Sequence, residues 1–118
     1  MTLYQQLILD HYRNPRNQGV LIAPTHCAEM NNPTCGDKLC MQILVENDII
    51  KDVKFTGSGC AISQASASIL TDFLKGKSVD EAKNIEKKDL LELLGIELSL
   101  TRLKCALLSL ETFKKAIK

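Results

Sequence analysis

The sequence lacks an excess of charge of either sign, a long apolar run and a signal-like beginning, and each absence excludes a class of protein. Its formal net charge is only +1, so neither nucleic acid nor an anionic membrane surface is expected as a partner. No apolar run approaches the roughly 20 residues that a membrane-spanning helix needs. The N-terminus lacks the charged, then apolar, then small-residue pattern of a secretory signal, so we expect a cytoplasmic protein.

Internal repeats, low-complexity segments and linkers are also missing, so residues 1–118 are expected to form a single domain. A chain of this length should bury roughly 65% of its unfolded surface, which is enough for a core without a disulfide or a metal ion. The five cysteines are an odd number. In a reducing compartment they are better explained as thiols or ligands than as a disulfide framework.

The first half of the chain predicts one helix followed by an antiparallel sheet. A capping box that begins at Thr2 starts the helix, and Asn14-Pro15 ends it because the residue before proline leaves the α region. Apolar residues alternate over residues 39–46, which predicts a strand that returns across a turn at 47–48. A further strand around residues 25–31 joins them. The return strand is expected to bury Ile49, Val53 and Phe55.

After Gly59 the apolar period changes from that of strands to that of helices. The first of these helices is expected to end at Gly76, a second to begin with a capping box at Ser78, and a third to end at Gly95. The last is expected to begin near residues 99–101. The predicted fold class is therefore α+β, a three-stranded antiparallel sheet with an N-terminal helix and several C-terminal helices packed on one face.

Three cysteines lie beside turn signals, where a thiol can be reached by a metal or a substrate. Cys35 precedes a glycine, Cys60 follows one and opens a helix, and Cys105 lies in the first turns of the last helix. Asp37, two residues after Cys35, can share its side of the chain. Three thiolates and one carboxylate form an acceptable tetrahedral zinc site. The alternative is three unrelated, partly buried thiols.

Such a site would carry a charge of −2 with zinc bound, so nearby cations are expected to stabilise it. The candidates are Lys38, Arg102 and Lys104. A carboxylate is a harder ligand than a thiolate, so we expect a site that can open or exchange. The two remaining cysteines, Cys27 and Cys40, fall in the predicted strands and are interpreted as small apolar residues rather than ligands.

Five stretches of the chain form an ordered set of motifs. They are YQQLILDHYRNPRNQG (residues 4–19), NPTCGD (32–37), FTGSGCAISQASAS (55–68), GKS (76–78) and RLKCA (102–106). Together they resemble the IscU/SufU/NifU N-terminal family of iron–sulfur cluster assembly proteins, over nearly the whole chain. The resemblance implies that the ligand positions are Cys35, Asp37, Cys60 and Cys105. These positions hold zinc in some members and are proposed to build a [2Fe–2S] cluster in others.

The resemblance also implies a role in iron–sulfur cluster biogenesis in the cytosol. A pyridoxal-phosphate cysteine desulfurase would donate the sulfur, and downstream iron–sulfur assembly or recipient proteins would receive it. Lys104 occupies the position where the IscU branch has histidine, and residues 96–100 lack the Leu-Pro-Pro-type motif of that branch. The chain is therefore closest to the SufU branch, although it lacks the extra segment that SufU relatives usually carry between the second and third of these cysteines.

Three functions are compatible with these residues. In the first, the protein is a zinc-dependent sulfurtransferase, and its catalytic cysteine accepts a persulfide from the desulfurase. That cysteine is Cys35 in SufU-like relatives and Cys105 in IscU-like relatives. In the second, the protein is a non-enzymatic scaffold that builds a [2Fe–2S] cluster, or holds iron, and hands it on. In the third, it is a structural zinc-binding interaction module, which an aspartate ligand fits poorly.

Overall fold

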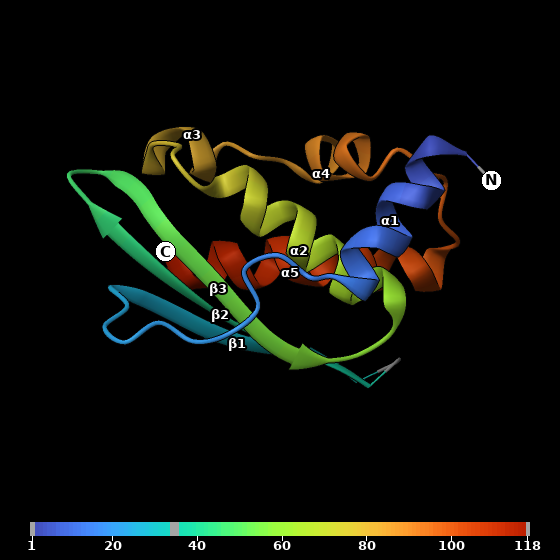
Figure 1. The fold of residues 1–118 in the computed structure, drawn as a ribbon, viewed down its shortest axis with the longest axis horizontal. Coiled ribbons are helices and arrows are strands. Elements are labelled where there is room, and N and C mark those ends of the chain that lie inside the picture. The colour runs from blue at the N-terminus through green and yellow to red at the C-terminus, as the bar shows by residue number, and fades with distance from the viewer. Residues whose placement is uncertain (1, 34–35, 118) are drawn as a thin grey trace.

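The computed structural model of the protein describes residues 2–33 and 36–117, and the predicted α+β class is confirmed. The three strands form one antiparallel sheet in the order β1-β2-β3, and the helices lie on one side of it (Figure 1). The elements are, in chain order, α1 (Leu3–Arg13), β1 (His26–Asn32), β2 (Asp37–Glu46), β3 (Ile49–Ser58), α2 (Ala61–Leu74), α3 (Val79–Lys83), α4 (Lys87–Leu94) and α5 (Leu100–Ile117).

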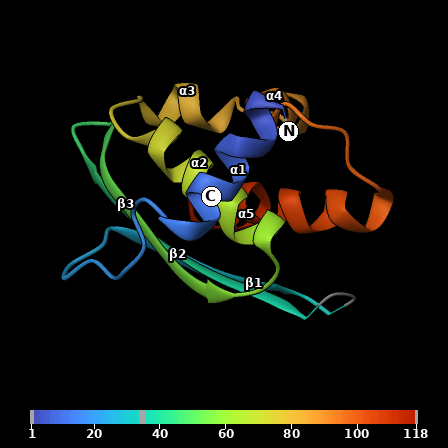
Figure 2. The same ribbon diagram turned by 45° about the vertical axis from the view of Figure 1, so that its right-hand side comes forward.

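Helices α2 and α5 form the layer that contacts the sheet. Helix α5 packs against β1 and β2, helix α2 packs against β3 and α5, and α1 covers α2 (Figure 2). Because side chains alternate along a strand, one face of the sheet is apolar and meets these two helices. Met41, Ile43, Val53 and Phe55 are fully buried there. Each such side chain stabilises the fold by on the order of 2 kcal/mol, so this interface sets how the strands and helices are placed.

The ends of most elements follow the local signals of the sequence. Thr2 caps α1, and the reciprocal bonds of its capping box are both present. The side chain of Ser78 caps α3 by accepting a hydrogen bond from the backbone N–H of Glu81, in the first turn of the helix. Gly76 and Gly95 follow helices with φ angles of 85° and 68°, a left-handed conformation that glycine adopts without strain. Within the described residues, no helix is both long enough and apolar enough to cross a membrane.

The hairpin between β2 and β3 contains a bulge that was not predicted. Asn47 and Asp48 form the turn with φ angles of 52° and 61°, as a type I′ turn requires. The strand pairing then changes register between Leu44 and Val45. As a result Ile50 is fully buried, whereas Ile49 is only partly buried. The expectation that Ile49 lies on the buried face was wrong, because one extra residue inverts the alternation.

Candidate metal centre

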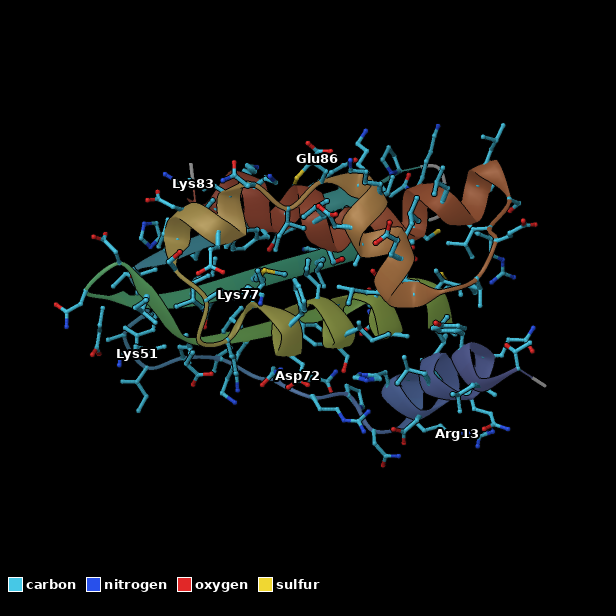
Figure 3. All side chains as sticks on the ribbon, turned by 90° about the horizontal axis from the view of Figure 1, so that it is seen from above. Arg13, Lys51, Asp72, Lys77, Lys83 and Glu86 are labelled. Carbon is cyan, nitrogen blue, oxygen red and sulfur yellow. The ribbon has the colours of Figure 1, made fainter. Side chains whose placement is uncertain are left out.

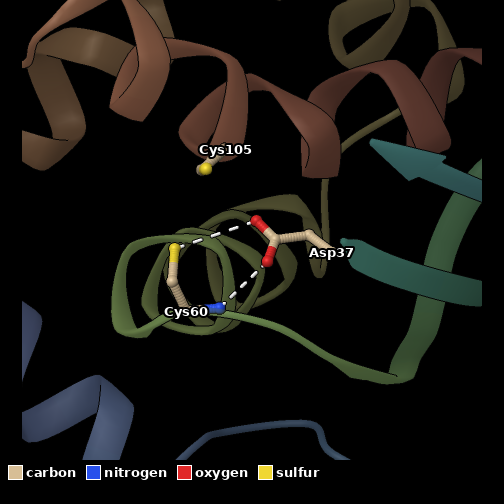
Figure 4. Close-up of side chains that lie close together, drawn as sticks. All are labelled: Asp37, Cys60 and Cys105. Atoms are coloured by element: carbon tan, nitrogen blue, oxygen red, sulfur yellow. Dashed lines mark hydrogen bonds between the residues drawn. The ribbon is translucent and has the colours of Figure 1, made fainter. Parts of the chain in front are cut away.

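Three side chains with metal-binding groups meet where β2 begins and where α2 approaches α5 (Figure 4). Asp37 is the first residue of β2, Cys60 is the N-cap of α2, and Cys105 lies in the second turn of α5. One carboxylate oxygen and the two sulfur atoms lie within 4.8 Å of one another. No other group of three or more His, Cys, Asp or Glu side chains is this close among residues 2–33 and 36–117.

The carboxylate of Asp37 is oriented by the start of α2. Its Oδ1 atom accepts a hydrogen bond from the backbone N–H of Cys60 over 3.0 Å, and its Oδ2 atom lies 3.8 Å from the Cys60 sulfur. Asp37 is only 1% exposed. A hydrogen bond to one ligand oxygen fixes a carboxylate for metal binding in the same way as the outer partners of known metal sites. One oxygen is therefore held by the backbone while the other faces the sulfurs.

Gly59 has no side chain, and the carboxylate of Asp37 occupies the space where a Cβ atom would lie. A Cβ atom at Gly59 would lie 2.5 Å from Oδ1 of Asp37 and 2.5 Å from the hydroxyl oxygen of Ser63. Both distances are far shorter than a van der Waals contact, so any other residue would displace these side chains. The sequence showed Gly59 only as a turn residue before a helix. Its role in making room for Asp37 depends on a contact between residues that are distant in the chain.

The position of Cys105 relative to Cys60 is set by a buried polar contact between α5 and α2. The hydroxyl of Ser66 donates a hydrogen bond of 2.6 Å to the carbonyl oxygen of Ala106, and it lies 3.0 Å from the hydroxyl of Ser109. Ala106 directly follows Cys105. Since buried hydroxyl groups need a partner, this contact favours one register of the two helices. Sequence reasoning missed this contact because its two residues lie 40 positions apart in the chain.

The group of three donors fits zinc. Tetrahedral ligands with Zn–S bonds near 2.3 Å lie on the order of 3.5 to 4 Å apart, so atoms within 4.8 Å need to move little. Sulfur and carboxylate oxygen are both donors that zinc accepts, and a tetrahedral site takes a fourth ligand. Cys35, the fourth predicted ligand, lies outside the described residues. The ligand roles of Cys35, Asp37, Cys60 and Cys105 remain predictions.

The expected counter-charge from Lys38 is not supported by the structure. Asp37 and Lys38 are neighbours in β2, so their side chains point to opposite faces of the sheet. The ammonium group of Lys38 lies 3.3 Å from the carboxylate of Glu29 on the outer face. Arg102 and Lys104 are exposed residues of α5 near Cys105. Their contribution to the charge balance of the site stays a prediction.

The two remaining described cysteines lie outside this group. Cys27 and Cys40 are on adjacent strands, on the face of the sheet opposite the helices. Cys40 is half-buried, and burial raises the pKa of its thiol, with a further increase from the carboxylate of Glu29. A raised pKa keeps the thiol protonated and weakens it as a ligand or nucleophile. Cys27 is exposed rather than packed.

Comparison with known proteins agrees with this arrangement. The sequence matches the family described as the NifU-like N terminal domain over residues 3–118. It is 40% identical to the zinc-dependent sulfurtransferase SufU of Bacillus subtilis (strain 168), in a match that covers 98% of this chain and 90% of that protein. It is 43% identical to the iron–sulfur cluster assembly scaffold protein IscU of Aquifex aeolicus (strain VF5), with coverage of 98% and 74%.

A solved structure supports the same relationship. It is that of a candidate iron–sulfur cluster assembly scaffold protein for the SUF system from Fervidobacterium islandicum AW-1, which superposes with a TM-score of 0.82 at 29% identity and covers 96% of this chain and 95% of that one. The Bacillus match runs over 133 residues, more than the 118 of this chain, so the Bacillus protein contains residues that this chain lacks. The chain belongs to the NifU-like N-terminal domain family, together with IscU- and SufU-type proteins.

Proposed function

We propose that this protein acts in iron–sulfur cluster assembly as a zinc-dependent sulfurtransferase, with Cys35, Asp37, Cys60 and Cys105 as its zinc ligands. The observation that carries the proposal is the approach of Asp37, Cys60 and Cys105 to within 4.8 Å from three separate elements. The 40% identity to a protein named for this activity supports it. The sulfur donor is a pyridoxal-phosphate cysteine desulfurase, and downstream iron–sulfur assembly or recipient proteins take the sulfur. The cytosol is the expected location, since thiols stay reduced there.

Zinc, when bound, would keep the cysteine ligands deprotonated at neutral pH. The protein itself contributes the positions of those ligands. The backbone N–H of Cys60 holds one oxygen of Asp37, and the contact between Ser66 and the backbone of α5 holds Cys105 opposite Cys60. Because a carboxylate is a harder ligand than a thiolate, Asp37 would make this a site that can open or exchange a ligand.

The transfer step is a thiol exchange. A cysteine thiolate of this protein attacks the terminal sulfur of the persulfide on the desulfurase. A new S–S bond forms on this protein while the S–S bond to the desulfurase cysteine breaks, and that cysteine leaves as a thiolate. Cys105 is only 3% exposed, so its sulfur must be uncovered before it can attack. We therefore assign Cys35 as the first acceptor, with Cys105 as the alternative.

Metal content and desulfurase turnover test this proposal together. The protein is purified without added iron, its zinc is quantified, and it is then mixed with the desulfurase and cysteine. Bound zinc near one per chain and faster turnover are expected, with a persulfide found on Cys35 by mass spectrometry. Cys35→Ser should abolish the acceleration, whereas Cys27→Ser, which changes an exposed thiol outside the site, should not. Zinc-free protein that accelerates the desulfurase equally would contradict the proposal.

A scaffold function is the second candidate, and the 43% identity to an IscU scaffold protein favours it. In that case the same residues would bind iron and sulfide as cargo and pass on a [2Fe–2S] cluster. Anaerobic incubation with iron, cysteine and the desulfurase separates the two functions. A coloured cluster that transfers intact to an apo-protein, without a stable persulfide on this chain, would establish the scaffold.

A purely structural zinc module is the third candidate. The apolar interface between the sheet and helices α2 and α5 holds the fold together without a metal, so zinc is not needed to build a core. If the protein is a structural module, removing zinc with a chelator should unfold it, and adding the protein to the desulfurase should not change the desulfurase's turnover. If the protein is a sulfurtransferase, the chelated protein should stay folded but should no longer accelerate the desulfurase.

A further inference from the structure

An open pocket of about 910 Å³ lies beside the last two turns of α5, beyond Cys105. Its walls come from β1, from the connection between α3 and α4, and from residues 110–117 of α5. None of the residues around it belongs to the metal centre. A pocket of this size is comparable with sites that bind a ligand or anchor a partner, and nothing in the proposed sulfur transfer uses it.

The floor of the pocket is apolar. It is formed by Met30, Ile85, Leu110 and Ile117. Leu110 and Ile117 are seven residues apart, so they lie two turns apart on one face of α5. The floor along this helix is therefore about 10 Å long, from the rise of 1.5 Å per residue. That length matches two turns of a helix laid into the pocket.

The rim of the pocket is basic. Four lysines surround it, against two glutamates, although the whole chain has a net charge of only +1. Figure 3 shows Lys83 at the end of α3 and Glu86 just before α4, on the side of α5. One of the two glutamates, Glu86, forms an exposed ion pair of 3.7 Å with Lys88, which is not part of the pocket lining. The other is Glu111, which is exposed.

Two of the lysines are held in place by the backbone. The ammonium group of Lys114 donates a hydrogen bond to the carbonyl oxygen of Lys83, and that of Lys115 donates one of 3.1 Å to the carbonyl oxygen of Glu29. A carbonyl group positions an ammonium group without cancelling its charge. The rim therefore presents positive charge at fixed places around an apolar floor, and this combination complements an apolar surface flanked by carboxylates.

We propose that this pocket is a docking site for an acidic amphipathic helix of a partner protein. The apolar side chains of that helix would lie on the floor formed by Leu110 and Ile117, and its carboxylates would meet the lysine rim. Helix-in-groove recognition uses apolar anchors at positions i, i+3, i+4 and i+7, which is the spacing that a floor of two turns accepts. The partner would then contact the C-terminal part of α5 and none of Asp37, Cys60 and Cys105.

A synthetic peptide tests the proposal on the 118-residue chain as it is purified. The probe is a 14-residue helix with leucines at positions i, i+3, i+4 and i+7 and glutamates beside them, and the control replaces each glutamate by lysine. Binding is followed by two-dimensional NMR of the ¹⁵N-labelled protein. The glutamate peptide should shift the signals around Ile85, Leu110 and Ile117, and binding should weaken as salt is added. The lysine peptide should leave these signals in place.

Charge-reversing variants give the matched comparison. Lys87→Glu on the rim should weaken binding of the glutamate peptide at least about threefold. Lys51→Glu, at another exposed lysine, in β3, should leave it unchanged. Glu111→Lys should strengthen it. Equal binding of both peptides, or no shift with either, overturns the proposal. Two further controls can overturn the proposal. If the same signals shift when the protein concentration alone is raised, the occupant is a second copy of the chain. If they shift when the fatty acid decanoate is added but not with either peptide, the occupant is a small amphiphile.

Discussion

The backbone N–H of Cys60 and the carboxylate of Asp37 are joined by a hydrogen bond of 3.0 Å, across 23 positions of the chain. The same carboxylate has its second oxygen 3.8 Å from the Cys60 sulfur. A strand and a helix thus bring an oxygen and a sulfur donor together. The hydrogen bond limits how the carboxylate can turn, so changes near it should alter metal binding in predictable directions.

Replacing Asp37 by alanine is expected to slow metal release. Only cysteines would then remain among the protein's predicted ligands, and the hard oxygen ligand that detaches most easily would be gone. We expect transfer of zinc to an excess of chelator to be slower than in the wild type. The exposed Asp72→Ala is the control and should release zinc at the wild-type rate. Unchanged kinetics in Asp37→Ala would refute this role.

Replacing Gly59 by alanine is expected to weaken zinc binding. The added methyl group would lie 2.5 Å from both Asp37 and Ser63, and the resulting strain also moves the adjacent Cys60. A loss of roughly 10- to 100-fold in zinc affinity is expected, measured by competition with a chelator of known affinity. Gly76→Ala is the control, because Gly76 has open space around it but a φ of 85°. It should lower stability by roughly 1 kcal/mol and leave zinc affinity intact.

Replacing Ser66 by alanine should loosen the contact between α2 and α5. The carbonyl oxygen of Ala106 would lose a buried hydrogen bond of 2.6 Å but keep a longer one, of 3.3 Å, from the hydroxyl of Ser109. The expected cost is about 1 kcal/mol of unfolding free energy in urea titrations. Zinc affinity should fall as well, since this contact holds Cys105 opposite Cys60. Thr112→Val removes a buried hydroxyl that bonds only within α5. If both variants bind zinc equally, the contact at Ser66 does not position the site.

The stability of the protein is expected to fall below pH 6.5 because of His11. Its ring nitrogen Nδ1 lies 2.7 Å from the hydroxyl of Ser68, which also accepts a hydrogen bond from the backbone of Arg16. Burial lowers the pKa of His11 below its ordinary value of 6.5. The positive charge of Arg16 lowers that pKa further, against the opposing carboxylates of Asp10 and Asp72. The folded state therefore favours the neutral ring.

The direction of the pH effect follows from this lowered pKa. The unfolded chain takes up the proton first, so the contribution of His11 to stability is complete above pH 6.5. It is lost as the pH falls from 6.5 through the lower pKa of the folded state. Urea unfolding at pH 7.5 and pH 5.5 should show a smaller drop for His11→Gln than for the wild type, with His26→Gln as control. An equal drop in His11→Gln would exclude this origin.

Local signals were sufficient to predict where most elements begin and end. The capping box at Thr2 and the left-handed glycine at Gly95 involve residues within one turn of each other, so the sequence alone contains them. The antiparallel hairpin was predicted for the same reason. The bulge that buries Ile50 instead of Ile49 was not, because it depends on how two strands pair rather than on either strand alone.

Contacts between residues that are distant in the chain could not be predicted from the sequence. The buried bonds of Ser66 with Ala106 and of Ser68 with His11 join residues 40 and 57 positions apart. A helix such as α2, buried on nearly every side, has no polar stripe to reveal which face meets which neighbour. The grouping of Asp37 with Cys60 and Cys105 was predicted from motifs. That the side chain of Lys38 points away from Asp37 could not be predicted, because it depends on β2 beginning at Asp37.

Zinc K-edge X-ray absorption on protein isolated without added iron tests the central claim most directly, since it counts the ligand atoms around the metal. The account predicts one zinc per chain with three sulfurs near about 2.3 Å and one oxygen at roughly 2.0 to 2.2 Å. One sulfur should disappear from this shell in each of Cys35→Ser, Cys60→Ser and Cys105→Ser. A shell with fewer than three sulfurs in the wild type, or one that is unchanged in these variants, would contradict it.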